Sequence, residues 1–181
     1  MTGHSKGGAL STTLALWLAD TQGGAPVPEA DRWDPLRKAT VCAYSFAGPT
    51  AGNEEFASHS NAVIGPRCYR IVNHLDVVPH AWASSDMQEI PGLYGPPDGD
   101  RAMLKGLIDE VIKTIGPLNY HHVGNNVTQL SGVLKPETPF VLQLVHQHLD
   151  GYLEQMGLGN EMNTATFFAP VVGRPSLIQG R

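Results

Sequence analysis

The sequence predicts an α/β fold in which helices and strands alternate around a mainly parallel sheet. Two runs of β-branched, aromatic and small apolar residues, 40–46 and 68–73, are predicted to be buried strands. A helix-like segment precedes each of them, at 8–19 and at 53–62. Because a helix separates successive strands, we expect parallel strands joined by crossover connections.

The first predicted helix follows a G-x-S-x-G motif formed by Gly3, Ser5 and Gly7. In a nucleophile elbow, a strand ends, the chain turns sharply at the serine, and a helix begins at once. Glycine suits the flanking positions because strand and helix approach closely there. The alternative is a glycine-rich helix start in which Ser5 is an ordinary capping residue.

The segments around the motif favour the elbow. Apolar side chains recur at helical spacing over 8–19, at Leu10, Leu14 and Trp17. The helix over 53–62 is predicted to begin at the N-cap Asn53, with two glutamates in its first turn. The later elements are expected to be a loop at 81–100, a helix at 100–115 and a short strand pair at 119–123 and 126–130. Residues 137–156 are expected to form either one long helix or a helix with a break near His146, followed by an irregular tail at 157–181.

Length and composition limit the classes of protein to which the chain can belong. The chain has 181 residues, enough for one domain with its own core, so residues 1–181 are expected to form a single domain. Its net charge is -5 without a basic cluster, which argues against nucleic acid as a partner. No apolar run approaches the roughly 20 residues of a transmembrane helix. Cys42 and Cys68 are interpreted as small apolar residues on strands; a disulfide between them is not implied.

A serine hydroxyl needs a histidine to accept its proton, and a buried carboxylate to orient that histidine. After such an elbow, the acid and then the histidine follow along the chain. Asp76 fits the acid because it comes directly after the strand 68–73 and is flanked by apolar residues. The other interpretation of Asp76 is a turn residue before a proline. The rival acids lie in the loop: Asp86, Asp98 and Asp100.

Four histidines lie late enough to act as the base. His148 is preferred because Leu149, Tyr152 and Leu153 behind it provide a helical anchor, and His146 is the reserve. The other two, His121 and His122, are interpreted as packed or surface residues. His4 is expected to orient or pack rather than to act as a base. Without an HExxH motif or a carboxylate-spaced cluster, no catalytic metal is predicted.

These motifs resemble the class 3 lipases, the fungal-type triacylglycerol lipases of the α/β-hydrolase superfamily. The elbow resembles the T-G-H-S-L-G-G-A of the family, with Lys6 in place of the leucine. Residues 44–53 resemble its TFGxPxxGN segment, and residues 70–79 its R-x-x-N-x-x-D-x-V-P segment. Residues 120–124 resemble its Y-x-H-V-G strand. The similarity extends over roughly residues 2–156, and several motifs in the right order are more specific than one.

The resemblance implies a serine hydrolase of carboxylic or lipid esters. It implies Ser5 as the nucleophile, Asp76 as the acid, His148 as the base and the backbone N–H of Lys6 as an oxyanion donor. The reaction needs no cofactor. The implied partner is an ester or lipid substrate, with contact to a lipid interface.

Family members carry several strands, a lid and a second oxyanion donor before the elbow. From this comparison we expect an N-terminally truncated domain in which even the strand before the elbow is absent. Because losing one oxyanion donor costs on the order of 10²–10³ in turnover, we expect weak or no activity from such a chain. The alternatives are an inactive fragment or interaction domain, and an acyltransferase that uses the same three residues.

Overall fold

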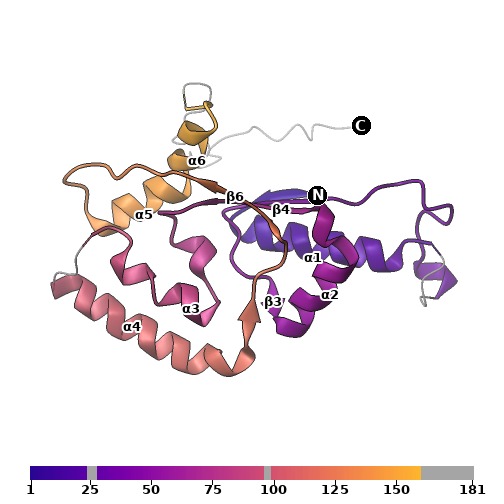
Figure 1. Ribbon diagram of the computed structural model, residues 1–181, viewed down its shortest axis with the longest axis horizontal. Helices are drawn as coiled ribbons and strands as arrows, with labels where there is room; N and C mark the ends of the chain where they lie inside the picture. The colour runs from indigo at the N-terminus through magenta and orange to yellow at the C-terminus, as the bar shows by residue number, and fades with distance from the viewer. Residues whose placement is uncertain (24–27, 96–98, 160–181) are drawn as a thin grey trace, which may run out of the picture.

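A four-stranded parallel sheet forms the centre of the computed structural model, which describes residues 1–23, 28–95 and 99–159. Its strands are β1 (Thr2–His4), β2 (Ala43–Phe46), β4 (Cys68–Asn73) and β6 (Asn126–Leu130), in the order β1-β2-β4-β6. Every neighbouring pair is parallel. The predicted α/β fold with a parallel central sheet is confirmed (Figure 1).

Helices α1 (Lys6–Thr21) and α2 (Glu54–Ile64) connect the first three strands of this sheet. Both lie on one side of the sheet, while α6 lies on the other (Figure 1). As predicted, Asn53 caps α2, its side chain accepting a hydrogen bond from the Phe56 amide at 3.0 Å. The core between these helices and the sheet consists of Ala15, Leu16, Val41, Ala43, Ala57, Ile64, Cys68 and Val123.

The helix α1 presents a different face to the core from the one its apolar residues suggest. Its buried residues include Gly8, Ser11, Thr12, Ala15 and Leu16. The apolar stripe is instead exposed, with exposed fractions of 56% for Leu10, 41% for Leu14 and 56% for Trp17. Small residues face the sheet because helix and sheet approach closely there.

The expectation that the strand before the elbow is absent is wrong. Residues Thr2–His4 form β1, and each pairs with β2 in parallel register, from Thr2 beside Tyr44 to His4 beside Phe46. The terminal amine of Met1 also donates to the Cys42 carbonyl at 2.7 Å. Three residues suffice for this strand because β2 supplies the hydrogen-bonding partners.

The two segments expected to pair around Gly124 instead join different sheets. β5 (Tyr120–His121) pairs antiparallel with the short strand β3 (Gly52–Asn53), whereas β6 joins the central sheet beside β4. Gly124 has a φ of 93°, and its amide donates to the Asn61 side chain at 2.7 Å. This left-handed turn, anchored to α2, separates the two strands instead of folding them together.

The remaining helices are α3 (Ser84–Met87), α4 (Gly99–Ile115), α5 (Phe140–His148) and α6 (Asp150–Gln155). Of the two alternatives for residues 137–156, the structure has the interrupted helix, with the break at Leu149 between α5 and α6. Short 3₁₀ turns cover Glu29–Asp31, Gly65–Arg67, Val78–His80, Ile90–Gly92 and Gly116–Leu118. Of the predicted tail, residues 160–181 lie outside the described residues. Within the described chain, no helix combines the length and apolar character needed to cross a bilayer.

Candidate active site

Ser5 occupies the turn between β1 and α1. Its backbone has φ 60° and ψ -129°, a conformation that L-residues rarely adopt, and its amide donates to the Phe46 carbonyl at 2.9 Å. Its side chain forms no capping hydrogen bond to α1. The geometry is therefore that of the predicted elbow and not that of an ordinary capping serine.

Close packing explains two glycines near this turn. A Cβ on Gly3 would overlap the backbone of Gly7. A Cβ on Gly8 would lie 2.8 Å from the Ser45 hydroxyl and 2.9 Å from the Phe46 carbonyl. Strand and helix can approach this closely only without side chains at these two positions.

Asp76 lies in the turn that follows β4 and is fully buried. Its Oδ1 accepts a hydrogen bond from the Val78 amide at 3.0 Å, and its Oδ2 accepts one from the Tyr152 hydroxyl at 3.0 Å. A turn aspartate that served only the local backbone would not need a partner from α6. These bonds orient the carboxylate for a third donor.

That third donor is His148, the last residue of α5. Its Nδ1 lies 2.9 Å from Oδ2 and 3.1 Å from Oδ1 of Asp76, and its Nε2 lies 2.8 Å from Oγ of Ser5. With Nδ1 protonated and donating to the carboxylate, Nε2 is free to accept the serine proton. The three residues preferred from the sequence thus lie together in one hydrogen-bonded chain.

A buried polar network supports Asp76 from behind. The Tyr152 hydroxyl accepts from the Asn73 amide at 2.9 Å, and the Asn73 side chain donates to the Gln147 side chain at 2.8 Å. Burial, and then the charge of Asp76, raise the pKa of Tyr152. The motif matches included Asn73, but its bond to Gln147 has no sequence signal, because that contact depends on how α5 docks.

His4 lies directly beside His148. Its Nε2 donates to the backbone carbonyl of His148 at 2.8 Å. The two imidazole rings are 4.7 Å apart between centroids, and the Tyr152 ring lies edge-on to His4 at 5.5 Å. The expectation that His4 orients or packs agrees with these contacts.

Lys6 is the first residue of α1, so its amide N–H has no partner within the helix. This donor and the positive end of the helix lie next to Ser5, where the oxygen of a bound carbonyl would acquire negative charge. The Lys6 side chain is exposed. The described helix has no acidic residue in its first turn to balance that charge.

The reserve histidine, His146, is not part of this arrangement. Its ring lies 3.7 Å from Asp150 and 3.7 Å from Glu154, both on the α6 side of the break. His146 and His148 are two residues apart on α5, so their side chains point in different directions. Geometry therefore favours His148 over His146.

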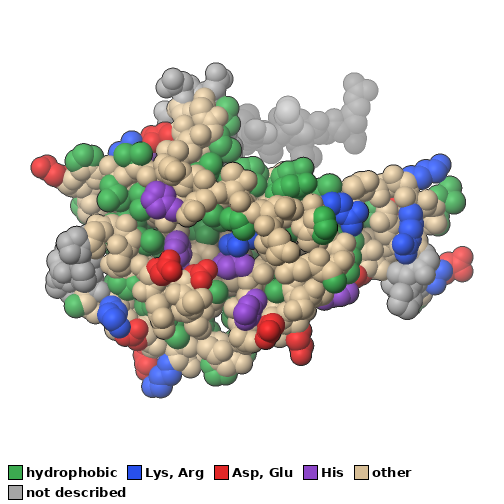
Figure 2. Space-filling model, viewed as in Figure 1, with side chains coloured by type: hydrophobic (Ala, Val, Ile, Leu, Met, Phe, Trp, Pro, Cys, Tyr) green, Lys and Arg blue, Asp and Glu red, His purple; other side chains and the backbone are tan. Residues whose placement is uncertain are grey.

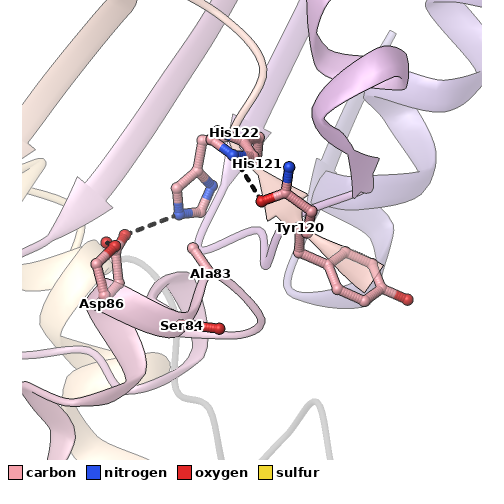
Figure 3. Close-up of a pocket in the computed structure, with 8 residues that line it drawn as sticks. Ala83, Ser84, Asp86, Tyr120, His121 and His122 are labelled. Atoms are coloured by element: carbon pink, nitrogen blue, oxygen red, sulfur yellow. Dashed lines mark hydrogen bonds and ion pairs between the residues drawn. The ribbon is translucent and has the colours of Figure 1, made fainter. Parts of the chain in front are cut away.

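His122 and the rival acid Asp86 lie together in a second polar region. Figure 2 shows histidine side chains gathered near acidic ones around the middle of one face. His122 Nε2 lies 3.1 Å from the Asp86 carboxylate, and His121 Nε2 lies 3.2 Å from the Asn119 side-chain oxygen. These four residues line a pocket of about 370 Å³ (Figure 3). Burial, and then the charge of Arg70, lower the pKa of His122 to about 4.

Asp86 is thus engaged elsewhere, and neither His121 nor His122 contacts Ser5 in the described contacts. Of the other rival acids, Asp98 lies outside the described residues, and so does the side chain of Asp100. Cys42 and Cys68 are both free thiols, and Cys68 is in the core. In the described ranges, no group of three or more His, Cys, Asp or Glu is placed to hold a metal ion.

Comparisons with known proteins find a lipase family and a lipase structure that are similar to this chain. A family model described as lipase (class 3) matches residues 1–85, which include Ser5 and Asp76 but not His148. Among solved structures, the crystal structure of M37 lipase is 33% identical with a TM-score of 0.77; the match covers 92% of this chain and 47% of that chain. The chain therefore spans about half the length of that lipase. No curated protein sequence matches the chain.

The fold of the relative agrees with the parallel sheet and flanking helices described above. Residues 1–85 therefore match the class 3 lipase family, and the fold is of the α/β-hydrolase type found in a lipase, which confirms the family resemblance predicted from the motifs.

Proposed function

We propose that this chain hydrolyses carboxylic esters, including lipid esters, with Ser5, His148 and Asp76 as a catalytic triad. The observation that carries the proposal is the continuous chain of hydrogen bonds from Ser5 Oγ through both ring nitrogens of His148 to Asp76, at 2.8 and 2.9 Å. A serine and a histidine at this distance, with a buried carboxylate behind them, form the arrangement that activates a hydroxyl nucleophile.

In the proposed reaction, Ser5 Oγ attacks the ester carbonyl while His148 Nε2 takes the hydroxyl proton. Asp76 keeps Nδ1 protonated and stabilises the imidazolium that forms. The imidazolium then gives its proton to the leaving alcohol, and an acyl-enzyme remains. Water, deprotonated by His148, releases the acid and restores Ser5.

The Lys6 amide is the proposed oxyanion donor. Ester hydrolases with this elbow use a second N–H from another loop, and one donor is worth on the order of 10²–10³ in turnover. The described residues suggest one such donor, at the start of α1.

A fluorophosphonate probe tests this function directly, because it reacts covalently with an activated serine. Labelling is expected on the folded wild-type protein and is expected to disappear in Ser5→Ala. We expect His148→Ala and Asp76→Asn to slow it by on the order of 10³-fold or more. Hydrolysis of p-nitrophenyl esters of different chain length then separates short-chain esterase from lipase activity. A folded wild-type protein that takes up no label would refute the proposal.

A second candidate function, an inactive interaction domain, is favoured by the exposed apolar stripe of α1. Leu10, Leu14 and Trp17 lie on one face of that helix and are each at least 41% exposed. Exposed apolar patches of this kind are typical of docking surfaces. Absence of labelling, together with self-association that Trp17→Gln and Leu14→Gln reduce in analytical ultracentrifugation, would support this function instead.

A further inference from the structure

His4 makes close contacts to the proposed base but takes no part in the reaction described above. It is the last residue of β1 and directly precedes Ser5. It therefore belongs to the strand that carries the nucleophile, whereas His148 belongs to a helix 144 residues later in the sequence. A contact between them fixes the distance between nucleophile and base.

The hydrogen bond from His4 reaches a backbone carbonyl at the C-terminal end of α5. The last carbonyls of a helix have no partner within it, and α5 ends at His148. His4 Nε2 donates to the His148 carbonyl at 2.8 Å, and the Asn73 side chain donates to the preceding Gln147 carbonyl at 3.0 Å. Side chains from β1 and β4 thus tie the end of α5 to the carboxyl ends of two sheet strands.

The protonation state of His4 suits this role. One side of its ring is exposed, and the other side is covered by His148 and Tyr152. This partial burial, and then repulsion from His148, lower the pKa of His4. A neutral His4 with its proton on Nε2 donates to the carbonyl without placing a second positive charge beside the imidazolium that forms on His148.

We propose that His4 is a positioning residue that holds the His148 imidazole over Ser5. It acts through two contacts, the hydrogen bond to the His148 backbone and the packing of its ring against the His148 ring at 4.7 Å. The proposal rests on the proposed function, because it explains how His148, the proposed base, is held in position relative to Ser5. A shift of about 1 Å in a catalytic group can cost 10²-fold in rate.

The test compares two substitutions of His4, of which only one keeps a side-chain donor for the His148 carbonyl. His4→Gln places an amide N–H three bonds beyond Cβ, as Nε2 is in histidine, whereas His4→Phe keeps a ring but removes the donor. The exposed His121, which lies outside the site, provides the control His121→Phe. The rate constant for fluorophosphonate labelling and the unfolding temperature are measured for all four proteins.

We expect the labelling rate constant of His4→Phe to be about 10–100-fold lower than that of the wild type. The rate constant of His4→Gln should stay within about fivefold of the wild-type value, and that of His121→Phe should equal it. The unfolding temperatures show that labelling is compared between folded proteins. His4→Phe labelling as fast as wild type, or His4→Gln as slow as His4→Phe, would overturn the proposal.

A second measurement does not depend on activity. Imidazole ¹H–¹⁵N spectra report whether His148 keeps its proton on Nδ1, hydrogen-bonded to Asp76. A sharp Nδ1–H signal in wild type and in His4→Gln, broadened or lost in His4→Phe, supports the positioning role; an unchanged signal in His4→Phe contradicts it. If the wild-type protein takes up no label, the proposed function fails, and these spectra still decide whether His4 orients His148.

Discussion

Replacing Tyr152 by phenylalanine tests whether the buried network behind Asp76 holds the molecule together. The Tyr152 side chain is 2% exposed, and its hydroxyl joins two groups of the β4 segment. It donates to Asp76 Oδ2 at 3.0 Å and accepts from the Asn73 amide at 2.9 Å. Tyr152→Phe removes both bonds and changes little else, because the ring remains.

The size of the effect follows from burial. A hydrogen bond to a charged group contributes about 1.5–3 kcal/mol, and a buried donor left without a partner costs about 1–3 kcal/mol. Asn73 is 1% exposed, so water cannot easily reach its amide. We expect Tyr152→Phe to lower the free energy of unfolding by about 2–5 kcal/mol, and Tm by roughly 5–15 °C for a chain of this size.

The matched control is Tyr94→Phe. Tyr94 is 8% exposed, and its hydroxyl donates to the neutral Leu75 carbonyl at 2.9 Å. We expect this variant to lose about 0.5–1.5 kcal/mol. Urea denaturation and differential scanning calorimetry on both variants measure the difference. Equal losses in the two variants would refute the reasoning, since the charge of Asp76 and the buried Asn73 amide would then contribute nothing extra.

Three further predictions concern the elbow and the second polar region. Ser5→Gly removes the strain of a positive φ at a non-glycine residue, so it should raise the free energy of unfolding by about 1 kcal/mol in urea titrations. It should also abolish probe labelling. A less stable variant would contradict the claim that the Ser5 backbone is strained. Gly3→Ala should lower the free energy of unfolding by at least about 1–3 kcal/mol, because the added Cβ would overlap the Gly7 backbone. Gly7→Ala should be neutral or slightly stabilising, because its Cβ would meet open space. Equal effects of the two substitutions would refute the steric account. His122 has its pKa lowered from 6.5 to about 4, so the folded state binds fewer protons than the unfolded state in that window. Stability should therefore fall by up to about 3 kcal/mol as pH decreases from 6.5 to 4, and His122→Gln should flatten this part of the pH–stability profile.

The parts of the fold that were predicted correctly are those whose signal is local. The strand Cys68–Asn73 has the predicted bounds, because a run of apolar and β-branched residues ends at a polar turn. Asn53 was recognised as a cap from its side-chain chemistry and the glutamates that follow. Ser5 and Asp76 were proposed in the same way, from motifs at the ends of strands.

The parts that were predicted wrongly depend on contacts distant in the sequence. β1 has three residues, too few for a periodic pattern, and exists because β2 lies beside it. The pairing of β6 with β4 cannot be read from either strand alone. His148 was preferred over His146 by sequence, but only the docking of α5 places its ring 2.8 Å from Ser5. The outward face of α1 was unexpected because apolar spacing identifies a helix but not what covers it.

The hydroxyl–imidazole pair at the centre of this molecule joins residues 143 positions apart. During translation, Ser5 is made 143 residues before His148, so under the proposed function the growing chain carries its serine over that stretch without the histidine that would deprotonate it. If the proposed function holds, products that end before His148 would not react with the probe, and labelling would report that α5 has docked against the sheet as well as the chemistry of Ser5.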